Sequence, residues 1–171
     1  MSASRLPVKV GIALGSNLDQ PVGNIREAFC FLESLSIAPI LCSSLYETTP
    51  VDCPPGSPPF INAVAEITLA HGSNPLELLR TLQHYEVSHG RPPEHDVNAP
   101  RTIDLDILYF GDLVLKVKSL TLPHPRLIER QFVLEPLAEI RPSLILPGDF
   151  LTVSQRLQNL PARDPAFRKV G

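Results

Sequence analysis

The sequence has 171 residues, of which 43% are hydrophobic and 19% are charged. This composition is typical of a globular protein and excludes an intrinsically disordered chain. The net charge of −3 leaves no basic surface of the kind that broad binding to nucleic acids or anionic membranes requires. A local cluster of arginines would still be able to bind a small polyanion.

Length and composition indicate a single domain over residues 1–171, with a core from about residue 8 to about residue 160. The three cysteines, Cys30, Cys42 and Cys53, form no C-x-x-C pair and no metal-binding spacing with histidine. Such a sparse, odd count is typical of reduced thiols. The chain opens without a secretory signal and has no apolar run of about 18 residues. We therefore expect a soluble protein of the cytoplasm.

Strands and helices alternate in the first part of the chain. Runs of apolar and β-branched residues predict three strands, over 8–14, 40–46 and 60–69. Apolar residues at helical spacing predict one helix that opens at Asp19-Gln20-Pro21 and a second over 76–89, capped by Ser73-Asn74-Pro75. The second helix is expected to turn Leu76, Leu79, Leu82 and Val87 inwards.

The second part of the chain starts with a strand over 103–110, and 113–115 is expected to be its hairpin partner. Short helices are predicted over 127–140 and a final helix over 152–160. The order strand, helix, strand, strand, helix, strand is typical of a ferredoxin-like βαββαβ core. We therefore predict an α+β fold with an antiparallel sheet, both core helices on one face, an extra hairpin and C-terminal helices.

The strand over 103–110 carries the strongest chemical signal. Alternate side chains of a strand point to opposite faces, so Asp104 and Asp106 share one face and the aliphatic residues beside them share the other. Residues two apart on a strand lie roughly 6.5–7 Å apart, so the two carboxylates repel each other, and a bound Mg²⁺ relieves that repulsion. The alternative is a solvated strand face that carries two acids. Arg101, just before the strand, favours a site for metal and phosphate.

Two further stretches leave alternatives open. Gly15-Ser16-Asn17 follows the first strand and is consistent with an anion-binding turn or with a simple turn, since no Walker lysine and no G-x-G-x-x-G motif accompanies it. The long proline-rich loop over 47–59 is longer than about 12 residues, a length that is usually functional or disordered. We expect this loop to cover a substrate.

Five stretches together resemble the 6-hydroxymethyl-7,8-dihydropterin pyrophosphokinase family of folate biosynthesis. They are Gly15-Ser16-Asn17, Thr48-Thr49-Pro50, Phe60-Ile61-Asn62, the run from Pro100 to Asp106, and Pro123-His124-Pro125-Arg126. The resemblance extends from about Val8 to about Leu157. It implies that ATP donates its pyrophosphoryl group to the hydroxymethyl oxygen of the pterin and leaves as AMP.

The resemblance also implies roles for individual residues. Asp104 and Asp106 would hold two Mg²⁺ ions, and with Arg91 and Arg101 they would form the catalytic set. The residues implied in binding ATP are Gln83, Glu86, Arg91, Arg101, Ile107, Thr121, His124 and Arg130. The residues implied in binding the pterin are Thr48, Thr49, Val51, Phe60, Asn62 and Phe132. Without the resemblance, the two phenylalanines are consistent with ordinary core and His124 with an ordinary loop residue.

The chain departs from the family pattern at three positions. Asn98 stands where the family often has Trp, Pro93 where it often has a second Arg, and Val51 where it usually has Leu. We assign no role to Asn98 or Pro93. The expected partners are the small molecules ATP and pterin, with no nucleic acid and no membrane, and the chain is expected to be a monomer.

Two other classes of protein share part of the pattern. Polymerase-β-like nucleotidyltransferases also combine Gly-Ser with Asp-x-Asp, but their acids follow the Gly-Ser closely, whereas Ser16 and Asp104 lie most of a domain apart. A non-catalytic ferredoxin-like ligand-binding module would account for the fold but not for two acids and several arginines at matching positions.

Overall fold

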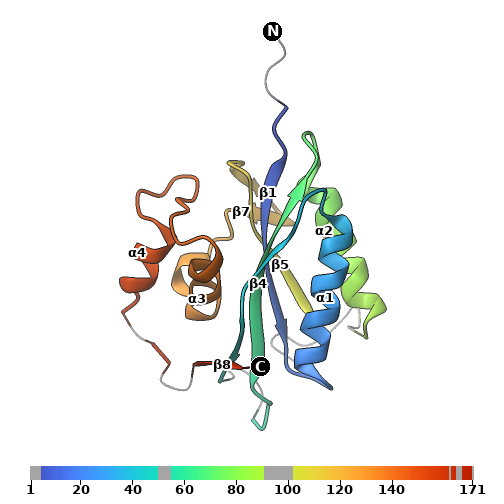
Figure 1. Ribbon diagram of the computed structural model, residues 1–171, viewed down its shortest axis with the longest axis vertical. Coiled ribbons are helices and arrows are strands. Elements are labelled where there is room, and N and C mark those ends of the chain that lie inside the picture. Colours follow the sequence, from blue (N-terminus) through green and yellow to red (C-terminus); the bar gives the residue numbers. More distant parts are fainter. Residues whose placement is uncertain (1–4, 50–54, 91–101, 162, 165–166, 171) are drawn as a thin grey trace.

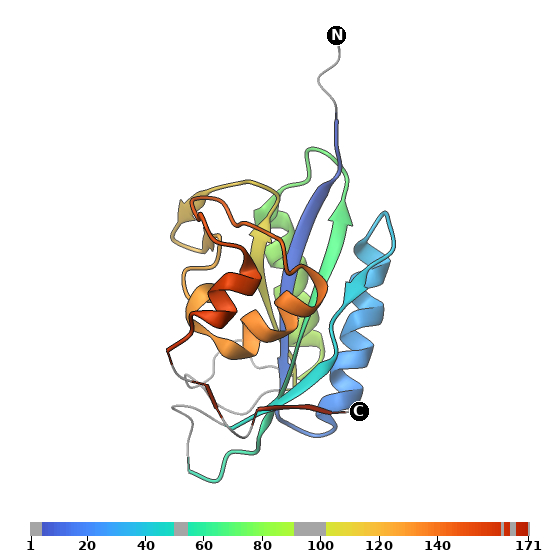
Figure 2. The same ribbon diagram turned by 60° about the vertical axis from the view of Figure 1, so that its left-hand side comes forward.

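The protein is described from a computed structural model, which covers residues 5–49, 55–90, 102–161, 163–164 and 167–170 (Figures 1 and 2). The strands are β1 (Val8–Ser16), β2 (Leu41–Cys42), β3 (Leu45–Thr48), β4 (Phe60–Leu69), β5 (Asp104–Phe110), β6 (Leu115–Val117), β7 (Leu120–Leu122) and β8 (Arg168–Val170). The helices are α1 (Pro21–Leu35), α2 (Pro75–Ser88), α3 (Gln131–Ile140) and α4 (Val153–Gln158), with a single 3-10 turn, η1, at Leu127–Glu129.

The main sheet is antiparallel and has the order β5-β1-β4-β3-β8, with β2 pairing on β4. Its two central strands, β1 and β4, pair from Val8 opposite Leu69 to Ser16 opposite Ile61. The chain reaches these strands in the order β1, α1, β2 with β3, β4, α2, β5. This order and the antiparallel sheet confirm the predicted α+β, ferredoxin-like core.

Helices cover both faces of the sheet (Figure 1). α1 and α2 lie on one face, as predicted, and α3 and α4 lie on the other. β4 serves both layers, because Ile61 and Ile67 pack with α1 and α2 while Val64 packs with α3. Both faces of β4 are therefore buried.

The two core helices begin where the sequence predicts. Asn74 Oδ1 accepts hydrogen bonds from the backbone N–H groups of Leu76 (2.8 Å) and Glu77 (3.4 Å), so it caps α2. The inward position of Leu82 is confirmed, but that of Val87 is wrong, because Val87 is 47% exposed. At 100° per residue, Val87 lies about 200° around the helix from the buried Tyr85 and so falls off the apolar stripe.

Three other predicted elements have different bounds. The strand over 40–46 is divided into β2 and β3 at Ser43, whose N–H donates to the Val64 carbonyl and whose Oγ accepts from the Val64 N–H, both at 2.9 Å. The hairpin is formed by β6 and β7, not by β5 and 113–115. Only two residues separate β6 from β7, a length that suits a tight hairpin, and β5 pairs with β1. The last predicted helix is shorter than expected and forms α4.

In the described ranges, no helix combines the length and apolar character needed to cross a membrane.

Candidate active site

Asp104 and Asp106 lie on β5 with their side chains on the face of the sheet opposite α1 and α2. Leu105 and Ile107, which alternate with them, are buried in the core cluster that packs against α1 and α2. The two acids are half-buried. The predicted acidic pair on one face of this strand is therefore present, and its other face is core.

Gly15 on β1 is the point at which the two halves of the site meet. It pairs with Asn62 on β4 on one side and with Asp104 on β5 on the other. Directly paired residues of an antiparallel sheet point to the same face. A Cβ at Gly15 would lie 3.3 Å from Asn62 Oδ1 and 3.9 Å from Phe60 Cδ1. Glycine therefore keeps an open space between the amide and the acids.

The amide side of the site is rigid. Asn62 Nδ2 donates a 2.8 Å hydrogen bond to Thr48 Oγ1, and both side chains are buried. Thr48 pairs with Phe60 across β3 and β4, and Phe60 is half-buried. The sheet thus places three of the residues predicted to bind the pterin, Thr48, Phe60 and Asn62, side by side at one end of the central strands.

The start of α3 brings positive charge and an aromatic ring towards the acids. Burial and the nearby Arg126 lower the pKa of Arg130, while Asp106 and Asp104 raise it. The guanidinium carbon of Arg130 lies 5.4 Å from the ring centroid of Phe132. Arg130 is therefore a cation within the electrostatic reach of both carboxylates, and Phe132 is the next aromatic residue along the chain.

His124 belongs to the same charged cluster. Burial, followed by the charges of Arg130 and Arg126, lowers the pKa of His124, and Asp104 opposes this effect. His124 Nδ1 accepts a 3.2 Å hydrogen bond from the backbone N–H of Arg126, and the His124 N–H donates to the Leu108 carbonyl at 2.8 Å. With Nδ1 as an acceptor, the neutral imidazole carries its proton on Nε2.

The side chains of Ser16 and Asn17 form hydrogen bonds to the backbone of the two loops that flank the site. Ser16 Oγ donates a 2.5 Å hydrogen bond to the Thr102 carbonyl, and Asn17 Nδ2 donates to the Pro58 carbonyl at 3.4 Å. Both side chains are at most 1% exposed. Ser16 also belongs to β1, which ends five residues before α1, so this stretch is a buried anchor and not the opening of a helix. The Gly15-Ser16-Asn17 motif was identified from the sequence, but the hydrogen bonds of its side chains to the flanking loops were not predicted.

Four residues predicted to bind ATP lie around β5. Glu86 Oε1 accepts a 2.8 Å hydrogen bond from the Leu105 N–H, so it holds the strand beside the two acids. Gln83 is exposed on α2, and Thr121 is half-buried on β7. The Ile107 side chain is 2% exposed and lies in the core, so any contact of Ile107 with a nucleotide must come from its backbone.

Three predicted residues, Arg91, Arg101 and Val51, lie outside the described residues. The described ends of the longer excluded segment lie near each other, since a Cβ at Gly90 would be 3.5 Å from Thr102 Oγ1. Thr49 is exposed, and its hydroxyl donates to Asp164 Oδ2 at 2.5 Å. Neither Asp164 nor its contact with Thr49 was predicted from the sequence.

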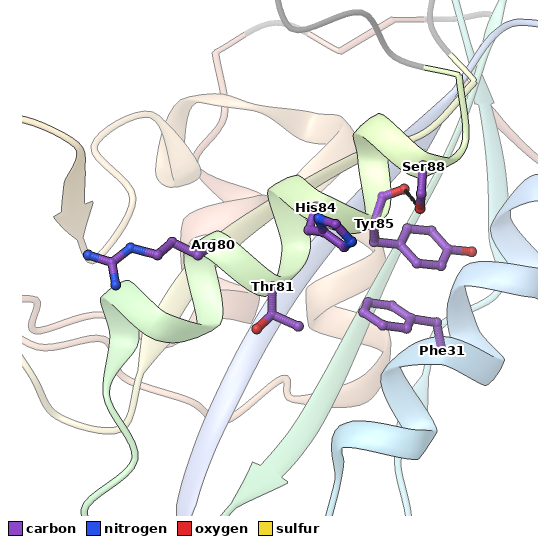
Figure 3. A pocket seen from close by; sticks show the side chains of 6 residues that line it. All are labelled: Phe31, Arg80, Thr81, His84, Tyr85 and Ser88. Atoms are coloured by element: carbon purple, nitrogen blue, oxygen red, sulfur yellow. Dashed lines mark hydrogen bonds between the residues drawn. The ribbon is translucent and has the colours of Figure 1, made fainter.

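A groove of about 510 Å³ lies between α1 and α2, on the face of the sheet opposite the acids (Figure 3). Its lining residues are Phe31, Arg80, Thr81, His84, Tyr85 and Ser88. Phe31 and Tyr85 stack there with ring centroids 4.1 Å apart, as Figure 3 shows. The groove lies between two helices, and none of its lining residues carries a carboxylate. It is therefore not the candidate active site.

The described residues contain no group of three or more histidine, cysteine and acidic side chains placed to hold a metal ion. Asp104 and Asp106 supply two carboxylates. Mg²⁺ is usually held by one or two protein carboxylates, with phosphate and water oxygens as its other ligands. The acidic pair therefore fits a magnesium ion that is shared with a phosphate-bearing substrate.

Comparison with known proteins gives one consistent result. The family model for 7,8-dihydro-6-hydroxymethylpterin-pyrophosphokinase (HPPK) matches residues 11–142. A protein of Pseudomonas aeruginosa named 2-amino-4-hydroxy-6-hydroxymethyldihydropteridine pyrophosphokinase is 41% identical over 141 residues, which cover 81% of this chain and 84% of that protein. The protein of the same name from Haemophilus influenzae is 39% identical, with 80% and 84% covered.

Longer relatives match as well. The folic acid synthesis protein fol1 of Pneumocystis carinii is 36% identical over 155 residues, which are 91% of this chain but only 20% of that protein. The crystal structure of Plasmodium falciparum HPPK-DHPS with pteroate matches with a TM-score of 0.69 at 15% identity, covering 92% of this chain and 43% of that one. At this identity the structural likeness supports the fold alone.

Proposed function

The chain belongs to the 7,8-dihydro-6-hydroxymethylpterin-pyrophosphokinase family, and from this premise we propose that it transfers pyrophosphate from ATP to 6-hydroxymethyl-7,8-dihydropterin in folate biosynthesis. The hydroxymethyl oxygen attacks the β-phosphorus of ATP. The bond from that phosphorus to the oxygen bridging to the α-phosphate breaks, and AMP leaves. The hydroxyl proton is released, and the products are AMP and the pterin diphosphate.

The observation that carries this proposal is the position of Gly15 between Asn62 and Asp104. An amide suited to a pterin edge and an acid suited to a metal-bound phosphate face the same side of the sheet, on the two strands that flank β1. The transfer requires the hydroxymethyl group and the triphosphate to meet in line, and holding the two reactants in place supplies much of the rate enhancement. The position of Asn62 and Asp104 on either side of Gly15 supports such an arrangement.

Asp104 and Asp106 are proposed to hold Mg²⁺, with two ions per active site. When bound, the metal neutralises charge on the triphosphate and polarises its oxygens. The two carboxylates lie on a strand whose opposite face is core, which holds the backbone that carries them in place before substrate arrives. Such fixed charges need no reorganisation during the reaction.

Positive side chains are proposed to hold the nucleotide. Arg130 lies within reach of the acid pair, and its planar guanidinium suits bidentate contact with phosphate oxygens. The lowered pKa of His124 favours the neutral imidazole at pH 7, and its Nε2–H is proposed to donate a hydrogen bond to the nucleotide. Arg91 and Arg101 are proposed to clamp the phosphates, and Gln83, Glu86, Thr121 and the Ile107 backbone to complete the ATP site.

The pterin is proposed to lie against Asn62, Thr48 and the ring of Phe60. One N–H of the Asn62 amide binds Thr48, and the amide retains a second N–H and its oxygen for the pterin edge. Phe60 and Phe132 are proposed to stack on the two faces of the flat pterin, with Thr49 and Val51 adding loop contacts. Each aromatic contact contributes about 1 kcal/mol beyond simple burial.

Purified protein, incubated with ATP, Mg²⁺ and the hydroxymethyl dihydropterin, tests the proposal. We expect AMP and the pterin diphosphate in equal amounts, resolved by ion-exchange chromatography. Formation of ADP would indicate transfer of a single phosphoryl group. AMP that appears without pterin would indicate a hydrolase or nucleotidyltransferase, and ligand binding without AMP would indicate the non-catalytic module.

The chain is further proposed to act as one domain and as a monomer, in the cytoplasm. A single sheet links the start of the described chain, through β1, to its end, through β8, which supports one folding unit. Light scattering coupled to size-exclusion chromatography measures the mass of the particle, for which 18.8 kDa is expected.

A further inference from the structure

The C-terminal segment is described at residues 163–164 and 167–170, and its strand β8 lies at the edge of the main sheet (Figure 2). β8 pairs with β3, with Glu47 opposite Arg168, and the two side chains form a 2.9 Å ion pair. Phe167 stacks on Tyr46 with ring centroids 5.0 Å apart. This segment lies beyond residues 11–142, which the family model matches. β3 ends at Thr48, so the segment is attached to the strand that presents this residue.

Asp164 connects this segment to two separate walls of the proposed pterin site. The Thr48–Thr49 wall is the end of β3, and the Phe132 wall is the start of α3. Its Oδ2 accepts a 2.5 Å hydrogen bond from the Thr49 hydroxyl and lies 3.5 Å from the Thr49 N–H. Its own N–H donates a 2.9 Å hydrogen bond to Gln131 Oε1. Thr49 follows Thr48 at the end of β3, and Gln131 begins α3 immediately before Phe132. One residue therefore links the strand end and the helix start.

We propose that Asp164 is a positioning residue for the pterin: it holds the Thr48–Thr49 wall and the Phe132 wall at a fixed separation. The inference rests on the proposed function, since it concerns the same pterin site. Both hydrogen-bond partners, Thr49 and Gln131, are next in the chain to residues proposed to bind the pterin, so we expect the effect of Asp164 to fall on the pterin.

The physical reason is preorganisation. Thr49 is exposed at the end of a short strand, where few packing contacts restrict it. A hydrogen bond to a carboxylate is stronger than one between neutral groups and fixes the hydroxyl before the ligand arrives. A site that is already ordered loses less conformational entropy on binding, which improves affinity without any new contact to the ligand.

The test measures KM for the pterin, KM for ATP and kcat in the full chain. In Asp164→Ala we expect KM for the pterin to rise about tenfold, the effect of losing one charge-assisted hydrogen bond, while KM for ATP stays within about twofold. Asp164→Asn keeps an oxygen acceptor for the Thr49 hydroxyl, so it is expected to restore most of the pterin affinity. A purely structural residue would raise both KM values or lower the melting temperature in parallel.

Two further variants, Thr49→Val and Arg168→Ala, test whether the effect of Asp164 depends on its hydrogen bond to Thr49. Thr49→Val removes the hydroxyl at the other end of the same hydrogen bond, so we expect it to reproduce Asp164→Ala, and the double variant to be no worse than either single one. Arg168→Ala breaks a different contact between the C-terminal segment and β3 and is expected to leave KM for the pterin unchanged.

The outcomes separate this inference from the proposed function. Wild-type protein that forms no AMP with the pterin would refute the proposed function itself. Wild-type turnover with an unchanged KM for the pterin in both Asp164→Ala and Thr49→Val would overturn the positioning role alone. An equal rise in both KM values would overturn it too.

Discussion

Tyr109 lies directly over Gly11, its partner across β5 and β1. A Cβ at Gly11 would overlap three atoms of the Tyr109 ring, namely Cε1, Cζ and Cδ1. The pairing register shifts between Gly11 and Ile12, so the strands are irregular at this contact. Glycine is therefore required here by close approach and not by an unusual backbone angle.

Gly11→Ala is expected to destabilise the protein by about 1–3 kcal/mol, because the added methyl group forces a ring in a packed core to move. Urea unfolding followed by far-UV circular dichroism measures the change. Gly23→Ala is the matched control, since a Cβ at Gly23 on α1 would meet its nearest atoms at an ordinary 3.7 Å. Equal stabilities of the two variants would contradict the close contact.

Tyr109→Phe tests the buried polar network formed by Tyr109, Glu66 and Arg141. The Tyr109 hydroxyl donates a 2.5 Å hydrogen bond to Glu66 Oε2, and Arg141 Nε lies 3.5 Å from the same oxygen. Glu66 is only 3% exposed, so its carboxylate depends on these partners. We expect a loss of about 1–3 kcal/mol in the free energy of unfolding. Tyr85→Phe, which preserves the ring stacked on Phe31, should cost less.

Asp149 and Arg156 give a prediction about pH. Arg156 donates to both oxygens of Asp149, from Nη2 at 2.5 Å and from Nε at 2.8 Å. Arg156, together with the Leu151 and Phe150 N–H groups, lowers the pKa of Asp149 from 3.8 to about 2 against the effect of desolvation. A carboxyl with a depressed pKa stabilises the fold above its unfolded pKa, and this contribution is lost as the pH falls from 3.8 through about 2.

Asp149→Asn should therefore be less stable than wild type by about 1–2 kcal/mol at pH 6, and the difference should close as the pH falls through that window. Urea unfolding at several pH values from 6 to 2 measures the difference. Glu129→Gln is the control, because Glu129 and Arg126 form an exposed pair at 3.9 Å. A deficit in Asp149→Asn that persisted unchanged at low pH would show that the charge is not its cause.

The core elements were predictable because their signals are local. The apolar stripe of α1 and the predicted cap of α2 at Ser73-Asn74-Pro75 are each contained in a short window of sequence, and the structure confirms the stripe and places the cap at Asn74. Errors arose where a distant partner decides the structure. Ser43 interrupts its strand by bonding to Val64, and nothing within a few residues of Ser43 reveals that partner.

For the candidate site too, features set by local sequence were predicted, whereas features set by distant partners were not. The resemblance to the family indicated its residues, and the alternation of β5 indicated that Asp104 and Asp106 share a face. That Asn62 and Asp104 lie on either side of Gly15 depends on how β4 and β5 both pair with β1, which no local pattern encodes. Asp164 was missed for the same reason, since it lies 115 residues from Thr49. The roles assigned to the individual site residues remain predictions.

The acid pair gives the most discriminating prediction. Asp104→Asn and Asp106→Asn are each expected to lower turnover at least about 100-fold, because fixed charge at the transferring phosphates carries much of the catalysis. Both variants are expected to remain folded, because the two acids are half-buried and lie on the face of β5 opposite the core that packs against α1 and α2.

Turnover of the pterin and differential scanning fluorimetry, measured with and without Mg²⁺ and a non-hydrolysable ATP analogue, separate the alternatives for this pair. A metal site predicts that the analogue with Mg²⁺ raises the melting temperature of wild type but not of either variant. Asp112→Asn, in the turn at the other end of β5, is the matched control and should behave as wild type. Near-normal turnover in either variant would leave a solvated strand face as the better account of the two acids.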